Sequence, residues 1–164
     1  MLERALIAPA ARAALIGHAK SRTDTETGGI LIGRRLAPDT VLISRVSPPG
    51  PRARHGRFFF SRDVAFLQSY LDEHYDRSGG SDDYVGEWHV HLAFDTPPSC
   101  VDRRSLYRIA RQPNYATDNP LLIIAEHEPP ELRLRAYGFQ VKPKRRTSSL
   151  PLRTATPTRA TQLN

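Results

Sequence analysis

The residues from Gly86 to Asp102 constrain the fold of this chain more than any other stretch. They begin with Gly-Glu-Trp-His-Val-His, continue through a loop that contains Pro97 and Pro98, and end with Ser99-Cys-Val-Asp102. The first part is rich in the aromatic and β-branched residues typical of strands. Serine ahead of a helical pattern is a good N-cap. The stretch predicts a strand over 84–91, a loop, and a helix from Ser99 to about Arg111.

Two histidines in the predicted strand point to the same side. Successive side chains of a strand alternate between its faces, so His89 and His91 share one face, while Trp88 and Val90 share the other and are expected in the core. Two imidazoles about 7 Å apart along a strand are close enough to share one metal ion. By itself, however, such a pair is far more often incidental. Ser99 and Asp102 also have a simple interpretation, as the N-cap and first-turn acid of a helix.

The rest of the first 140 residues alternates helical and strand-like patterns. A hairpin is expected where the apolar segment after Gly28-Gly29 meets the segment 41–46 across the turn at 37–40. This alternation predicts one α+β, or mixed α/β, domain over residues 1–140. The expected helices are 10–20 and 61–77, the latter capped by Ser61, and the further strands are 1–7, 57–60, 121–125 and an edge strand over 132–136.

The net charge of +7 is concentrated at the end of the sequence. Six of the 24 Lys and Arg residues lie after residue 140, which leaves 18 bases against 17 acids before it. We therefore expect residues 141–164 to be a disordered basic tail that binds nucleic acid weakly if at all. A single cysteine, Cys100, fits a reducing compartment, and no apolar run could cross a membrane. The cytoplasm is the expected location.

Taken together, the motifs resemble those of the JAB/MPN metalloprotease family, which carries the JAMM motif. The matching residues are a glutamate on an upstream strand, His-x-His, and Ser-x-x-Asp, found here as Glu26, His89, His91, Ser99 and Asp102. The sequence departs from the family pattern at Leu92, where a proline is usual. The resemblance covers roughly residues 5–140.

The resemblance implies a fold, a cofactor and a reaction. The fold would be a central curved, largely antiparallel sheet flanked by helices, similar to that of cytidine deaminases. One zinc ion per chain would be held by His89, His91 and Asp102, the same ligands that the chemistry of the side chains suggests. Glu26 would be the general base, and Ser99 would donate a hydrogen bond to the oxyanion.

Several alternatives remain at this point. Glu87 shares the face of the two histidines and rivals Glu26 as the base; without the resemblance the choice between them is open. Gly28 and Gly29 are interpreted as points where the backbone approaches the site closely. A metal-free scaffold, or a nucleic-acid-binding protein acting through its tail, would need no catalysis.

The compact chain resembles prokaryotic family members encoded beside ubiquitin-conjugating systems, including the CBASS and Bil antiphage operons. That implies a ubiquitin-like protein or its conjugate as substrate, and E1- or E2-like enzymes as further partners. We also expect the substrate tail to add a strand along the hairpin 26–46.

Overall fold

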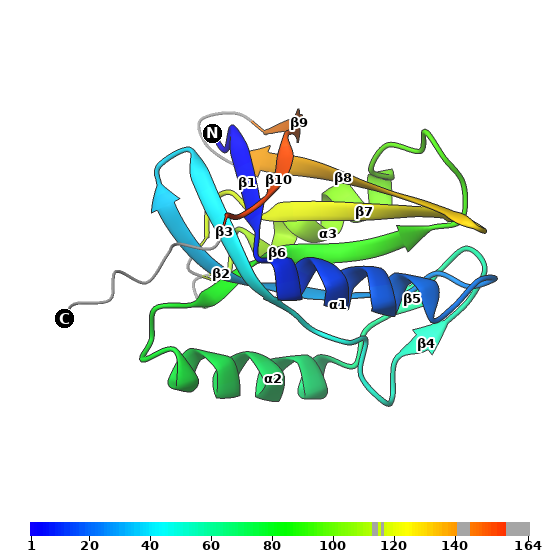
Figure 1. The fold of residues 1–164 in the computed structure, drawn as a ribbon, viewed down its shortest axis with the longest axis horizontal. Helices are drawn as coiled ribbons and strands as arrows, with labels where there is room; N and C mark the ends of the chain where they lie inside the picture. Colours follow the sequence, from blue (N-terminus) through cyan, green and yellow to red (C-terminus); the bar gives the residue numbers. More distant parts are fainter. Residues whose placement is uncertain (113–114, 116, 141–144, 157–164) are drawn as a thin grey trace.

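The computed structural model describes residues 1–112, 115, 117–140 and 145–156 (Figure 1). Helices and strands alternate along the chain, as expected. The helices are α1 (Pro9–Lys20), α2 (Val64–Arg77) and α3 (Cys100–Ile109), and the strands are β1 (Arg4–Ile7), β2 (Gly28–Ala37), β3 (Thr40–Val46), β4 (Arg54–His55), β5 (Phe60–Ser61), β6 (Asp83–His91), β7 (Leu121–Glu128), β8 (Glu131–Gln140), β9 (Arg146–Leu150) and β10 (Leu152–Thr154). No helix among these residues is long and apolar enough to cross a bilayer.

Eight strands form one curved, nearly closed sheet in the order β10-β1-β3-β2-β6-β7-β8-β9. Four of its seven pairings are antiparallel, among them the predicted β2–β3 hairpin, and three are parallel. The expected mixed α/β fold with a curved, largely antiparallel sheet is confirmed. The short strands β4 and β5 pair only with each other.

Helices cover both faces of the sheet, as alternate residues of β7 show. Leu121 and Ile123 belong to the core that includes α1, whereas Leu122 and Ile124 pack with α3 on the opposite face. The side chains of α2 pack on the same face as α3, against β2 and β6. Strand β7 is therefore buried on both of its faces, in agreement with its unbroken apolar sequence.

A bulge at Val85, next to Gly86, sets which side chains of β6 face α3. In the pairing with β2 the register shifts between Leu31 and Ile32, opposite Gly86 and Tyr84. A Cβ atom at Gly86 would lie 2.0 Å from the carbonyl oxygen of Leu121, so only glycine fits. The extra residue in β6 reverses the alternation of side chains between the two faces of the sheet for the residues that follow it. Trp88 consequently lies in the core, as predicted, and is 1% exposed.

The start of α2 differs from the expectation. Its N-cap is Asp63, not Ser61, which belongs to β5. The Asp63 carboxylate accepts hydrogen bonds from the backbone N–H groups of Phe66 and Arg52, so it caps the helix and also fixes the preceding loop. This second partner explains why aspartate prevails over the equally suitable serine two residues earlier.

The expectation of a disordered tail is wrong for residues 146–154. These residues form β9, which pairs with β8, and β10, which pairs in parallel with β1. Consequently β8 is not an edge strand. Only Pro151 separates the two new strands, so one short segment completes both edges of the sheet (Figure 1). The local sequence is polar, and its strand structure comes from pairing with edges that are distant in sequence. Residues 141–144 and 157–164 lie outside the described residues.

Leu150 anchors this closing segment, because it is 7% exposed and packs against Leu2 and Gly138. We expect Leu150→Ala to lower the free energy of unfolding by about 2–4 kcal/mol, since it removes buried methyl groups. The exposed Leu36 is the matched control, for which Leu36→Ala should cost within about 0.5 kcal/mol. Urea unfolding curves measure both changes. Equal midpoints for the two variants would show that the segment does not stabilise the sheet.

Candidate active site

A cleft of about 1060 Å³ opens between the start of α3, the end of β6 and the loop that precedes α2. Six of the eight residues singled out from the sequence line this cleft, and they come from segments far apart in the chain: Glu26, Glu87, His89, His91, Ser99 and Asp102. The two glycines, Gly28 and Gly29, belong to the adjoining strand β2. The sequence patterns therefore converge on one place.

Pairing between β2 and β6 brings Glu26 to the histidines. Gly28 lies opposite His89 in the register, and the Val90 N–H donates to the carbonyl of Thr27 at 2.8 Å. The Glu26 carboxylate reaches to 3.4 Å from His89 Nε2. A Cβ atom at Gly28 would lie 2.6 Å from the Trp88 carbonyl, so the missing side chain allows this close pairing.

Gly29 lies against core side chains, unlike Gly28. A Cβ atom there would meet the Ser47 hydroxyl at 2.5 Å and the indole nitrogen of Trp88 at 2.6 Å. That nitrogen donates to the Ser47 carbonyl. Gly29 thus makes room for core packing behind the site and does not border the cleft.

His89, His91 and Asp102 form the expected donor set. One nitrogen or oxygen from each lies within 4.8 Å of the others. Asp102 Oδ1 is 3.2 Å from His89 Nδ1, and Oδ2 is 3.6 Å from His91 Nε2. Two imidazoles and a carboxylate in this proximity match the three protein ligands of a catalytic zinc site.

The environment keeps the Asp102 carboxylate ionised. Burial raises its pKa, but hydrogen bonds from His89, His91 and Ser99 outweigh burial and hold the pKa far below the ordinary value. Burial lowers the pKa of His89, whereas the carboxylates of Asp102 and Glu26 raise it, to about 9. The negative charge that draws a proton to His89 is the same charge that would attract a cation.

Thr96, which the sequence did not single out, fixes the orientation of His91. Its hydroxyl donates its one proton to the Ala93 carbonyl at 3.0 Å, so toward His91 Nδ1, also 3.0 Å away, it can only accept. Nδ1 therefore carries a ring proton, which leaves Nε2, 3.6 Å from Asp102 Oδ2, as the nitrogen that can bind a metal. A neutral imidazole held in one tautomer by a hydrogen bond is the arrangement that metal ligation requires, so the donor set fits a metal.

A buried acid holds the Thr96 loop in place. Glu126 is completely buried, and its carboxylate accepts from the Thr96 N–H at 3.2 Å and from Arg135 Nε at 3.1 Å. Arg135 also pairs with Asp95, a residue with a φ of 58°. A sequence clue existed, since Glu126 directly follows the apolar run of a buried strand. Leu92, at the position of the family proline, packs against the core and fixes the same loop by contact.

Ser99 is the N-cap of α3, in a complete capping box. Its hydroxyl accepts from the Asp102 N–H at 3.1 Å and donates to Asp102 Oδ2 at 2.6 Å, and its own N–H donates to the same oxygen at 2.8 Å. The simple interpretation of Ser-x-x-Asp as a helix start is correct. Ser99 also lines the cleft, where its hydroxyl lies beside the donor set.

Glu87 lies on the cleft side of β6, but its carboxylate is engaged in an ion pair. Its buried carboxylate pairs with Arg62, whose guanidinium also contacts the Ser105 hydroxyl. Burial raises the pKa of Glu87, and the Arg62 charge opposes this effect. Glu26, in contrast, faces His89 directly, and its backbone is held by Gly56 and His55.

The β4–β5 hairpin carries an aromatic tip over the cleft. Phe58 is 84% and Phe59 is 54% exposed, while the Phe60 ring lies 6.0 Å from that of His89. The expected strand over 57–60 is thus mostly the turn of this hairpin. Over Leu31–Gly33 and Thr40–Ile43 the hairpin is paired on both sides, so the expected substrate strand has no free edge along these residues.

Comparisons with known proteins agree with this geometry. A family model described as prokaryotic homologs of the JAB domain matches residues 8–137. A probable metalloprotease, y4qB, of Sinorhizobium fredii is 36% identical over 112 residues, which cover 68% of each chain. A protein of Vibrio cholerae named CD-NTase/cGAS isopeptidase is 33% identical over 99 residues, which cover 60% of each chain. These names agree with the JAMM-type metalloprotease expected from the motif.

A solved structure supports the fold. The solution structure of protein DSY2949 from Desulfitobacterium hafniense superposes with a TM-score of 0.66 at 19% identity, covering 93% of this chain and 95% of that one. The isopeptidase from an Escherichia coli strain is 35% identical over 83 residues, so the chain spans about half of that relative's length. With a family model that matches most of its sequence, the chain belongs to the prokaryotic JAB family.

Proposed function

We propose that the chain is a zinc-dependent peptidase or isopeptidase that cleaves a protein from the C-terminus of a ubiquitin-like protein. The observation that carries this proposal is the convergence of Glu26 with His89, His91 and Asp102 in one open cleft. The names of the relatives, metalloprotease and isopeptidase, support the reaction class. The isopeptidase names also motivate a place in antiphage defence, in the cytoplasm, beside E1- or E2-like partners.

His89, His91 and Asp102 would hold the metal. Bound zinc supplies Lewis acidity and brings the pKa of its water to roughly 7. Thr96 keeps the Nε2 lone pair of His91 directed at the site. Asp102 presents its carboxylate from the first turn of α3, and Ser99 fixes one of the two carboxylate oxygens.

Glu26 and Ser99 would handle the proton and the developing charge. Glu26 takes a proton from the attacking water and gives it to the leaving amine, which is general base and then general acid catalysis. Ser99 turns its hydroxyl from Asp102 Oδ2 and donates a hydrogen bond to the carbonyl oxygen as negative charge develops there. The substrate amide must therefore enter between the β4–β5 hairpin and the start of α3.

The shape of the cleft favours an extended protein tail. The two-stranded β4–β5 sheet beside the cleft has unpaired edges within the described chain, so a substrate strand can pair there by main-chain hydrogen bonds. The exposed rings of Phe58 and Phe59, and the exposed Val101 at the start of α3, offer apolar contact on either side. Exposed apolar groups gathered around a cleft are typical of binding surfaces.

The base assignment can be tested with paired variants. We expect Glu26→Gln to lower kcat/KM for a ubiquitin-like fusion by about 10²–10⁴-fold while the zinc content is retained, because the proton acceptor is lost. Glu87→Gln should stay within about tenfold, since Glu87 is paired with Arg62. Steady-state hydrolysis and elemental analysis measure these effects. The reverse order of the two variants would assign the base to Glu87.

Capping and catalysis by Ser99 can be separated with two substitutions. Ser99→Ala should lower kcat by about 10²–10³-fold, as for the loss of an oxyanion donor, and cost about 1 kcal/mol of stability through the lost cap. Ser99→Gly should lower kcat equally but cost only a few tenths of a kcal/mol, roughly, because glycine is a tolerated N-cap. If activity follows stability across the two variants, Ser99 acts only as a cap.

Metal binding has a direct thermodynamic signature. Zinc at about 100 times its dissociation constant should stabilise the folded protein by roughly 2.7 kcal/mol, and a chelator should reverse the gain. His91→Ala should abolish the response, and Thr96→Val should weaken zinc affinity by about 10–100-fold through the freed imidazole. His74→Ala, on α2, is the matched control and should respond like the wild type. Thermal unfolding with and without zinc provides the measurement, and a wild type insensitive to zinc would contradict the proposal.

A further inference from the structure

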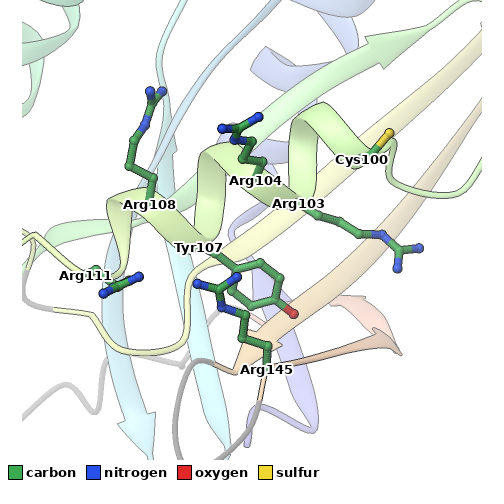
Figure 2. A pocket seen from close by; sticks show the side chains of 7 residues that line it. All are labelled: Cys100, Arg103, Arg104, Tyr107, Arg108, Arg111 and Arg145. Atoms are coloured by element: carbon green, nitrogen blue, oxygen red, sulfur yellow. The ribbon is translucent and has the colours of Figure 1, made fainter.

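A second hollow, lined by arginines, lies along the outer face of α3 (Figure 2). It has a volume of about 570 Å³. We call it the arginine groove and define it by Arg103, Arg104, Tyr107, Arg108, Arg111 and Arg145. The members on α3 recur at helical spacing, so they form one stripe. Arg111 follows in the turn just after the helix, and Arg145 joins from the segment before β9.

The charge of the arginine groove is not neutralised. None of its five arginines forms an ion pair within the described part of the chain, whereas Arg34, Arg62 and Arg135 each have a carboxylate partner there. The residues outside the described part contain no Asp or Glu that could serve. Like charges spaced at i and i+4 repel one another, so the stripe is an unfavourable arrangement unless an anion binds it.

The arginine groove adjoins the catalytic cleft at one residue. Arg108 lines both hollows, and α3 begins at the cleft with Ser99 and Asp102. From Asp102 to Arg108 the helix rises by about 9 Å, a distance that about three residues of extended peptide would cover. A protein segment that leaves the cleft along α3 therefore meets the arginines within a few residues of the bond to be cleaved.

We propose that the arginine groove binds an acidic segment of the protein substrate, on one side of the scissile bond. This inference rests on the proposed function for the identity of the ligand. The planar guanidinium fork pairs carboxylates with two parallel hydrogen bonds, and several forks along one helix suit a run of Asp or Glu residues. A nucleic acid is less favoured, because Arg145 lies over the Tyr107 ring, 5.3 Å from its centre, and occupies the stacking surface (Figure 2).

The first test is binding, which needs no catalysis. A fluorescein-labelled poly-glutamate peptide is titrated with the full chain, and anisotropy is measured at several salt concentrations. Arg104→Glu/Arg111→Glu should weaken binding at least about tenfold and flatten its salt dependence, because the charges that attract the peptide are reversed. Arg12→Glu/Arg153→Glu is the matched control: both arginines are exposed, lie away from the groove, and give the same change in net charge. The control should bind within about twofold of the wild type.

Two results would overturn the inference. If the control variant loses as much affinity as the groove variant, only the net charge matters. If single-stranded DNA binds more tightly than the peptide and depends on Arg104 and Arg111, the arginine groove is a nucleic-acid site. Circular dichroism melting curves of both double variants establish that they are folded.

The second test separates this inference from the proposed function. Two ubiquitin-like fusions, with an acidic or a neutral flank beside the scissile bond, are compared by their kcat/KM values. The wild type should prefer the acidic flank at least about tenfold, and Arg104→Glu/Arg111→Glu should lose the preference. Cleavage with no preference contradicts the arginine groove alone. Peptide binding that depends on the groove, without cleavage of either fusion, contradicts the proposed function alone.

Discussion

The close approach of Gly86 to the Leu121 carbonyl governs both the packing and the site of this protein. No side chain fits there, and the bulge at this point determines which faces of β6 the following residues occupy. Trp88 and Val90 consequently enter the core, and Glu87, His89 and His91 turn toward α3. A regular strand through the same residues would exchange the two sets and bury the histidines.

The donor set depends on the backbone of two elements and on hydrogen bonds beneath it. The strand pairing of β6 with β2 positions Glu26, and the first turn of α3 positions Asp102. Under them, Thr96 and Glu126 fix the loop that joins strand and helix. The Glu126 carboxylate is completely buried, where a hydrogen bond is more costly to lose.

The sequence was most informative where chemistry repeats at short spacing. His-x-His and Ser-x-x-Asp predicted the strand, the helix start and the side chains of the donor set together. The support residues Thr96, Glu126 and Arg135 come from separate segments, and only tertiary contacts unite them. Asp63 prevailed over Ser61 as a cap for the same reason, because its second partner is Arg52. The polar sequence of β9 and β10 gave no sign of strands whose partners are distant in the chain.

The position of the positive charge on the surface could not be predicted from the sequence either. The first 140 residues are nearly neutral in sum, yet four arginines of that region gather on one side of α3 and Arg145 from the tail joins them. The net charge of residues 1–140 does not reveal this cluster, because the acids that balance its charge lie outside the arginine groove. Several of these acids are paired with other arginines. Residues 145–154 therefore belong to the domain in structure, and Arg145 adds to the positive charge beside α3.

The closing segment around Pro151 also bears on self-association. The strands at the two margins of the sheet are short, five residues in β9 and three in β10, and consist mainly of Ser, Thr and Arg. Short, polar edge strands are poor templates for pairing with strands of other molecules. Next to β9 lies β8, with ten residues and an alternating apolar pattern. If β9 detached, the long edge of β8 would be free to pair with a strand of another molecule, so β9 protects that edge.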